Sequence, residues 1–328
     1  MQFHRKLFLH ATSAVILCAA ALMAASFFGR SMGQTQAFAR AAAQFNSRVF
    51  IPVVMKGDVQ EKSSSGNWLA YLNSYRSMAE LPPLSENNGW SLGSHHHARY
   101  TVKNDVLEHG EDNSNPWYTP EGHAAAQSGN IMASGNLEAG DDYAVDAWMQ
   151  APFHAVAILD PALKQVGFGS YREADGGLQM GATLDVLRGL GPVPAGVQFP
   201  VAWPADGTSV PLNLYWGEYP DPLSSCPGYA APSGLPVILQ VGPGDRIPGI
   251  NSHSFKRGSQ SLESCIFSES TYVNPDAMAQ DLGRAVLAER DAVVLIPREP
   301  LTLGATYSVS ITVDGQNYSW QFSVVGEN

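Results

Sequence analysis

The sequence predicts an α+β fold followed by an all-β domain, and three observations support this. Apolar residues recur at helical spacing in several stretches between residues 67 and 152. They alternate at strand spacing from 165 to 187, and beyond 197 they gather in short β-type runs. Residues 189–196, rich in glycine and proline, mark a boundary between the two parts. Helices followed by antiparallel strands are typical of an α+β layer fold.

The N-terminus has the pattern of an export signal. Arg5 and Lys6 precede an apolar stretch, residues 7–28, and Ala-Phe-Ala at 37–39 offers a cleavage site. We therefore expect residues 1–39 to be a signal peptide and the protein to be secreted or held in the cell envelope. The apolar stretch is long enough to cross a bilayer. An uncleaved N-terminal anchor is therefore the alternative, and it would be the only contact with a membrane.

Residues 40–66 end in a charged, serine-rich run and are predicted to be a linker. The net charge of the chain is −11. Removal of residues 1–39 makes the chain more acidic still, because that segment holds basic residues and no acidic ones. An acidic secreted protein is a poor partner for nucleic acid or for anionic lipid head groups. We expect no nucleic-acid partner.

Three helices are predicted before the first strands. Trp68, Leu72 and Tyr75 recur at helical spacing, and Pro82 and Pro83 then stop the helix because neither can donate a backbone N–H. A longer helix is predicted next, because one side of it would carry Trp90, Gly93, His97, Tyr100 and Asn104. The first helix is predicted at about 67–80 and the second at about 88–107. The third is predicted to have Asp141 as its N-cap and to be ended by Pro152.

A loop and two strands complete this part. Residues 110–122 are too rich in Asn, Pro and Gly for a regular element, so an ordered loop is expected there. Strands are expected at 165–171 and 178–187. The first of these strands begins with a Gly-x-Gly pattern.

The C-terminal part is predicted to be all-β, since helical signal is nearly absent. Strand-like runs occur at 237–241, 292–296 and 306–313, and the last is followed by Asp314-Gly315, a hairpin turn signal. Residues 300–324 resemble the last strands of bacterial immunoglobulin-like domains. That resemblance implies an immunoglobulin-like β-sandwich over residues 197–326.

Two cysteines lie outside the signal segment, Cys226 and Cys265. An even count in an exported protein favours a disulfide. It would close a loop of about 40 residues and stabilise the fold by about 3–4 kcal/mol. Two buried free thiols are the alternative.

Several motifs between residues 67 and 187 resemble those of one family. They are LNSYRSMAELPPL at 72–84, HARYTVKND at 97–105, LEHG ending at 110, and WMQAPFHAVAILDPALKQVGFG at 148–169. These segments are similar to the CAP domain of cysteine-rich secretory proteins, antigen 5 and plant pathogenesis-related proteins, in its bacterial type. The resemblance implies a CAP-type α-β-α sandwich over residues 67–190, in a secreted protein. It also implies a binding module more readily than an enzyme.

The resemblance further implies a central cleft lined by two histidines and two acidic residues. By the matching motifs, His109 and His154 correspond to the histidines, and Asp146 corresponds to one acid. The second acid belongs to a Gly-Glu-Asn motif, which reads Ser-Gly-Asn at 128–130 in this chain. Gly129 therefore replaces the family glutamate.

Two imidazoles and two carboxylates can together hold a divalent cation such as zinc. The resemblance thus implies His109 and His154 as metal ligands. With the glutamate missing, the site is short of one ligand unless His97, Glu111 or Glu121 replaces it. A hydrogen-bonded structural cluster without metal is the alternative.

Three further residues are candidates for this cleft. His97 is expected to be the inward-facing member of the run His95 to His97, because consecutive helical positions point about 100° apart. Trp117 and Tyr118 resemble the cleft-edge segment of bacterial CAP proteins, where they can stack on a sugar or an apolar ligand. Packing over the helix layer is the alternative role for these aromatic residues.

The function expected first is that of a secreted, non-enzymatic CAP module whose cleft binds a small ligand, a lipid or a cell-envelope glycan. One alternative is a hydrolase in which His109, His154 and Asp146 activate water, with or without zinc. Another is a surface adhesin in which the cleft is vestigial. Residues 89–93 match the G-x-S-x-G pattern of serine hydrolases, but no buried strand precedes them, so a nucleophile elbow is not expected.

Overall fold

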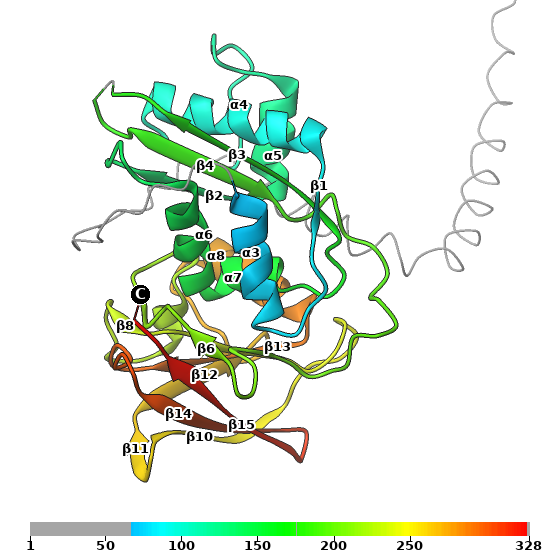
Figure 1. Cartoon of the computed structure of the whole chain (residues 1–328), viewed down its shortest axis with the longest axis vertical. Helices are drawn as coiled ribbons and strands as arrows, with labels where there is room; N and C mark the ends of the chain where they lie inside the picture. The colour runs from blue at the N-terminus through cyan, green and yellow to red at the C-terminus, as the bar shows by residue number, and fades with distance from the viewer. Residues whose placement is uncertain (1–66, 175, 327–328) are drawn as a thin grey trace, which may run out of the picture. The chain divides into compact units, whose positions relative to one another are not determined.

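A four-stranded sheet with helices on both faces forms the N-terminal part of the protein, residues 67–190 (Figure 1). The computed structural model describes residues 67–174 and 176–326. The strand order is β1-β3-β4-β2, in which β1 and β3 run parallel and the other pairs are antiparallel. The strands are β1 (Ser85–Glu86), β2 (Gly129–Ser134), β3 (Gln165–Arg172) and β4 (Met180–Asp185).

Five helices cover this sheet. Helices α4 and α5 lie on one face, and α3, α6 and α7 lie on the other (Figure 1). Their bounds are α3 (Trp68–Ser77), α4 (Asn88–Asn104), α5 (Pro120–Ser128), α6 (Asp141–Gln150) and α7 (Pro152–Ile158). The two expected strands and the first two expected helices are confirmed, and the mixed α+β content is that predicted from the sequence.

Helix α4 lies very close to the sheet, and its ends are set by its own sequence. The Asn87 side chain accepts hydrogen bonds from two N–H groups of the first turn, at 3.1 and 3.2 Å. The helix ends at Asp105, whose φ of 50° is left-handed. A Cβ atom at Gly167 or Gly169 of β3 would collide with the α4 backbone, so the Gly-x-Gly pattern permits this close packing.

The third helix is confirmed and ends at Gln150, just before Pro152, but its predicted N-cap is wrong. Gly140, not Asp141, is the N-cap of α6, and no side chain caps this end. The Asp141 carboxylate instead accepts hydrogen bonds from Ser170 (2.7 Å) and Arg172 (2.8 Å) of β3. Pro152 begins α7, where proline is tolerated in the first turn because that N–H has no helical partner.

The predicted loop over 110–122 ends earlier than expected, because α5 begins at Pro120. Thr119 caps this helix by accepting the N–H of Gly122 at 2.9 Å. A capping residue followed by proline is a helix start signal, and the glycine-rich and asparagine-rich composition before it obscured this signal. Strand β2 follows directly and was also not predicted from the sequence.

The C-terminal part, residues 197–326, consists of three sheets and two helical segments. The largest sheet has the order β11-β10-β14-β15-β6, the second has β12-β13-β9-β5, and β7 pairs with β8. The strands are β5 (Val201–Trp203), β6 (Ser209–Val210), β7 (Leu214–Tyr215), β8 (Ser233–Gly234), β9 (Val237–Gln240), β10 (Ile250–Arg257), β11 (Gln260–Leu262), β12 (Ser264–Ser268), β13 (Ala292–Pro297), β14 (Thr306–Val313) and β15 (Gln316–Val324). The helical segments are η1 (Pro222–Ser225) and α8 (Ala277–Ala288).

Strands β9, β13 and β14 confirm the three strand-like runs. Asp314 and Gly315 form the turn between β14 and β15, with positive φ values of 51° and 79°. Two positive φ angles match the right-handed twist of the flanking strands, which explains the choice of Asp and Gly. Aromatic rings of Phe255, Tyr307 and Phe322 stack in the core of the largest sheet.

The prediction that the C-terminal part is all-β is wrong at α8. Asp276 accepts the N–H groups of Met278 and Ala279, at 2.8 and 3.1 Å, so the helix has a standard N-cap. The cap and the apolar spacing after it were signals present in the sequence. Several small mixed sheets do not identify an immunoglobulin-like sandwich, which stays a prediction.

The two parts contact each other along α7. The Phe153 ring lies against the rings of Tyr272 (5.1 Å between centroids) and Phe267 (6.3 Å). Arg290 pairs with Asp160, just after α7, at 2.9 Å. The described residues belong to one compact unit. The domain boundaries at 190 and 197 stay predictions.

The predicted signal peptide (1–39) and linker (40–66) lie outside the described residues. Among the residues that are described, no helix is both long and apolar enough to cross a membrane.

Candidate functional site

Three histidines from separate segments form an electrostatically coupled group, which we call the histidine cluster. His97 comes from α4, His109 from the loop after it, and His154 from the first turn of α7. A positive charge on His154 or on His97 would lower the pKa of His109, so His109 lies within electrostatic range of both rings. The structure therefore brings together three of the predicted site residues.

His97 forms a buried pair with Glu111. Its Nδ1 lies 3.1 Å from the Glu111 carboxylate, and side-chain exposure is 1% for the histidine and 0% for the glutamate. The same carboxylate accepts the N–H of Thr119 at 3.0 Å. Within the described part of the chain, the buried Nε2 of His97 has no hydrogen-bond partner. The inward orientation predicted for His97 agrees with this burial.

His109 has its tautomer set by the backbone. Its Nδ1 lies 2.8 Å from the carbonyl oxygen of Ala126. A carbonyl can only accept, so Nδ1 donates, and Nε2 of the neutral ring carries the lone pair. His109 is exposed, yet protein surrounds its ring, and this burial is the main cause that lowers its pKa to about 4. The ring is therefore neutral at pH 7.

His154 pairs with Glu218, which comes from the C-terminal part. Its Nδ1 lies 2.6 Å from the Glu218 carboxylate, whose side chain is 1% exposed. The carboxylate also accepts the backbone N–H groups of Phe153 (3.0 Å) and His154 (3.3 Å) at the start of α7. Burial raises the pKa of Glu218, and the bond to His154 opposes this rise.

All three rings share one arrangement, in which Nδ1 bonds to an oxygen atom and Nε2 does not. The oxygen belongs to Glu111, to the Ala126 carbonyl and to Glu218. Such a bond fixes the rotation of an imidazole and leaves Nε2 as the atom that meets a ligand. The cluster can thus offer fixed lone pairs to hydrogen-bond donors.

The segment that carries Glu218 is held in place by bonds within the C-terminal part. The backbone N–H of Glu218 donates to the Tyr215 hydroxyl at 2.9 Å. Asp221 caps η1 through the N–H of Leu223 at 2.9 Å, and its carbonyl accepts the Tyr272 hydroxyl at 3.0 Å. These contacts fix the loop on both sides of Glu218.

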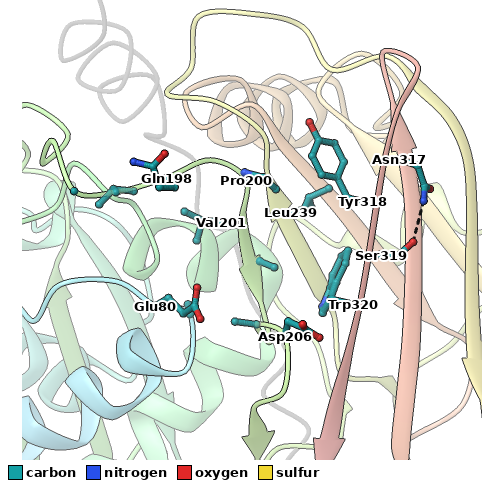
Figure 2. A pocket seen from close by; sticks show the side chains of 15 residues that line it. Glu80, Gln198, Pro200, Val201, Asp206, Leu239, Asn317, Tyr318, Ser319 and Trp320 are labelled. Carbon is teal, nitrogen blue, oxygen red and sulfur yellow. Dashed lines mark hydrogen bonds between the residues drawn. The ribbon is translucent and has the colours of Figure 1, made fainter.

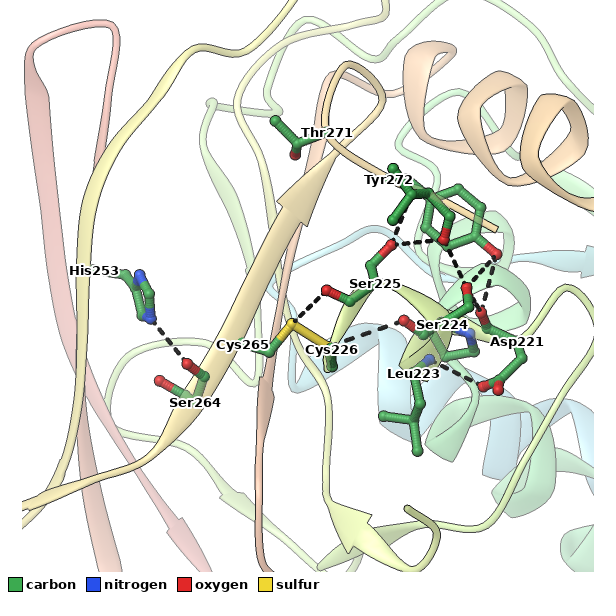
Figure 3. Close-up of a disulfide and its surroundings, with 12 residues drawn as sticks. Asp221, Leu223, Ser224, Ser225, Cys226, His253, Ser264, Cys265, Thr271 and Tyr272 are labelled. Carbon is green, nitrogen blue, oxygen red and sulfur yellow. Dashed lines mark hydrogen bonds between the residues drawn. A yellow bond between two sulfur atoms is a disulfide. The ribbon is translucent and has the colours of Figure 1, made fainter. Parts of the chain in front are cut away.

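The disulfide Cys226–Cys265 is confirmed, with Cα atoms 5.6 Å apart. Figure 3 shows that it joins the end of η1 to strand β12, beside the Asp221 and Tyr272 contacts. Only a few residues separate Glu218 from Cys226. The disulfide therefore restrains the loop that positions the carboxylate on His154.

Gly129, which replaces the family glutamate, occupies a position where a side chain does not fit. A Cβ atom there would lie 2.8 Å from the carbonyl oxygen of Leu184 and 3.0 Å from that of Ala125. The next residue, Asn130, donates to the His154 carbonyl at 3.2 Å. Position 129 therefore lies beside the cluster, and its backbone packing excludes a glutamate.

Asp146 is directed toward α3. Its carboxylate accepts hydrogen bonds from the hydroxyls of Tyr71 (2.7 Å) and Tyr75 (2.5 Å). Burial and this carboxylate raise the pKa of both tyrosines.

The two aromatic candidates differ in position. The Trp117 ring lies between Arg99 (5.1 Å) and Lys103 (5.3 Å) of α4, which corresponds to packing over the helix layer. Tyr118 lies 6.0 Å from His123, whose Nδ1 accepts the N–H of Glu111. Tyr118 is thus closer to the cluster, while Glu121, a candidate ligand, is exposed.

The cluster meets one requirement of a zinc site and misses another. Metal-bound histidines bond through Nδ1 to an oxygen, as these three do. Zinc sites use three or four protein ligands. Within residues 67–174 and 176–326, no group of three His, Cys, Asp or Glu side chains is arranged to hold a metal ion. The described residues do not fit a zinc centre, and cation binding by His109 and His154 stays a prediction.

Sequence reasoning missed Glu218 completely. Its neighbours, Trp-Gly before it and Tyr-Pro-Asp after it, form no motif that indicates a site. It lies 64 residues from His154 and in the other part of the chain. No local signal could have identified it.

Comparison with known proteins agrees with this architecture. Residues 69–182 match the model of the CAP family, described as the cysteine-rich secretory protein family. A search of curated proteins returned no match to the chain. The matched range contains the sheet strands β2 and β3, the helices α4 to α7 and all three clustered histidines. Residues 69–182 are therefore similar to a CAP domain.

Proposed function

We propose that this protein is a secreted or cell-envelope CAP-domain protein of the bacterial type that binds a small hydroxyl-bearing ligand, such as an envelope glycan, at the histidine cluster. In this proposal the protein is not an enzyme. Its C-terminal part completes the site by supplying Glu218.

The observation that carries the proposal is the state of His109. The residue is exposed, and its ring is neutral at pH 7 with the lone pair on Nε2. The buried His97 Nε2 nearby has no partner within the described residues. Acceptors that are fixed in orientation favour ligands with O–H donors, because a hydroxyl can then satisfy buried nitrogen atoms.

The hydrolase alternative has weaker support. A general base works best when its pKa is close to the working pH, whereas the pKa of His109 is about 4. Ser91, of the G-x-S-x-G pattern, lies in α4 and donates to Glu86 at 2.6 Å, not to a histidine. The binding proposal needs neither a strong base nor a nucleophile.

Export is part of the proposal and has independent support. A disulfide is typical of proteins that fold in an oxidising compartment. The apolar N-terminal segment and the acidic charge are compatible with secretion. Detection of the protein in the culture medium or envelope fraction, with its N-terminus sequenced, tests this part and distinguishes a cleaved signal from an anchor.

Binding can be tested with purified protein and insoluble peptidoglycan, with phospholipid vesicles as the second probe. We expect peptidoglycan to retain the protein, and the double variant His109→Ala/His154→Ala to bind at least tenfold more weakly. The control is His253→Ala, because His253 is exposed on β10 in the C-terminal part. Equal binding by the double variant and the control would reject the cluster as the site. Retention on vesicles but not on peptidoglycan would show that the ligand is a lipid rather than a glycan.

A further inference from the structure

A second cavity lies away from the histidine cluster, between the end of α3 and strand β15. Its volume is about 430 Å³, which is within the range of small-molecule sites. Figure 2 shows Glu80 and Gln198 on one side of it, and Tyr318 and Trp320 of β15 on the other. The cavity thus forms where the N-terminal and C-terminal parts meet.

The walls combine apolar and aromatic surfaces. Val201 and Leu239, from adjacent strands, contribute the apolar floor. Tyr318 and Trp320 are two residues apart on β15, so their rings lie on the same face of the strand. The indole N–H of Trp320 donates to the Pro204 carbonyl at 2.9 Å, which fixes that ring. A ligand would meet a preformed aromatic surface.

Every charged side chain that lines the cavity is negative. The two are Glu80 and Asp206, and the lining contains no lysine or arginine. Asp206 accepts the N–H of Gln321 at 2.9 Å. Neither carboxylate forms an ion pair with any residue that the structure describes. The cavity therefore presents two carboxylates without a counter-charge from the described protein.

Glu80 is held in its position by an unusual backbone conformation. Its φ is 58°, in the left-handed region that glycine normally occupies. Its N–H donates to the Ser77 carbonyl at 3.0 Å, and the N–H of Leu81 donates to Arg76 at 2.9 Å, which closes the turn after α3. A glycine would satisfy the same turn without strain. Glu80 therefore occupies a backbone conformation that disfavours residues other than glycine.

We propose that this cavity binds a small organic cation that bears an ammonium group. The carboxylates of Glu80 and Asp206 would attract the charge, and the faces of Trp320 and Tyr318 would contact its alkyl substituents and add cation–π attraction. An anionic ligand would meet two like charges. This site is separate from the histidine cluster and does not depend on the function proposed for it.

The test compares choline with its uncharged carbon isostere, 3,3-dimethylbutan-1-ol, by ligand-observed NMR on the purified protein. Choline binds and the isostere binds at least fivefold more weakly, since the two differ only in charge. Glu80→Gln and Asp206→Asn each weaken choline binding about five- to tenfold, and 0.5 M NaCl weakens it further. The control Glu138→Gln, an exposed carboxylate that does not line the cavity, leaves binding unchanged.

A further variant separates binding from folding. Glu80→Gly relieves the left-handed strain, so it raises or preserves the thermal midpoint while it weakens choline binding as Glu80→Gln does. Equal affinity for choline and the isostere would overturn the proposal. So would unchanged choline binding in both carboxylate variants, or binding of an N-acetylglucosamine trisaccharide in place of choline, which would make the cavity a saccharide site.

Discussion

The two buried histidine–carboxylate pairs of the cluster look alike and arise in different ways. His97 and Glu111 are 14 residues apart and both lie within the range that matches the CAP family model. His154 and Glu218 are 64 residues apart, and the glutamate comes from outside the matched range. The first pair depends on local folding of α4 and the loop after it. The second exists only when the C-terminal part is docked against α7.

This difference bears on position 129, where the sequence comparison predicts that glycine replaces a family glutamate. Backbone atoms of β4 and α5 leave no space for a side chain there. Glu218 instead supplies a buried carboxylate to the same histidine region, and three hydrogen bonds to α7 hold it. The following predictions test whether the two pairs are independent.

The largest effect is expected for Glu218→Ala. The variant leaves the backbone N–H of Phe153 and the His154 ring without an acceptor and removes one acceptor of the His154 N–H, so we expect a loss of about 3–5 kcal/mol in the free energy of unfolding. Urea denaturation measures it. The control Glu263→Ala removes an exposed ion pair with Arg298 and should cost less than about 1 kcal/mol. A loss below about 1 kcal/mol for Glu218→Ala would contradict the importance of this pair.

Removal of the disulfide should have the next largest effect. Cys226→Ser/Cys265→Ser opens a loop with a sequence separation of 39 residues and should cost about 3–4 kcal/mol. Because the disulfide restrains the Glu218 loop, the NMR signals of His154 should shift while those of His97 stay in place. Shifts of equal size at both histidines would show that the two pairs are coupled rather than independent.

Glu111→Ala should cost about 2–3 kcal/mol, because the His97 ring and the Thr119 N–H both lose an acceptor in a buried position. The effect is expected to be smaller than that of Glu218→Ala, since one hydrogen bond fewer is lost. Urea denaturation of the double variant Glu111→Ala/Glu218→Ala tests whether the two histidine–carboxylate pairs are independent. Additive losses within about 0.5 kcal/mol support it, and a clear departure from additivity opposes it.

Gly129→Ala should destabilise the protein by about 1–3 kcal/mol through contact of the new methyl group with the Leu184 and Ala125 carbonyls. Gly196→Ala is the matched control, because a Cβ there meets no atom within 4 Å. If Gly129→Ala is as stable as the control, steric exclusion does not explain the missing glutamate.

The smallest effect concerns pH. The pKa of His109 is about 4 in the folded protein and about 6.5 when unfolded. Between pH 4 and 6.5 the unfolded state binds more protons than the folded state does. The contribution of the neutral His109 ring to the free energy of unfolding is therefore complete above pH 6.5 and is lost as the pH falls toward 4. NMR titration should place the midpoint of His109 well below 6.5, the value of an unperturbed imidazole. A midpoint of His109 near 6.5 would contradict a neutral ring.

Part of the site was predictable because it lies in short-range motifs. The motif containing His109 and that containing His154 identified the two histidines, and helical direction identified His97. The spacing of apolar residues also predicted α3, α4, β3 and β4, since these elements follow from local patterns. The Cys226–Cys265 disulfide was predicted because an even number of cysteines lies outside the signal segment of a protein expected to be exported.

Other features were decided only by packing between distant segments. Asp146 matched the family motif, yet two tyrosines of α3 bind its carboxylate. The cavity beside Glu80 exists because β15 comes to lie opposite the end of α3.

The sequence alone thus determined several of the helices and strands, among them α3, α4, β3 and β4, because backbone propensity and periodicity act over a few residues. Only the tertiary structure decided which oxygen binds each imidazole. Glu218 reaches His154 through the docking of the C-terminal part, and that docking depends on the burial of surfaces far apart in the chain. No pattern along the sequence records this contact.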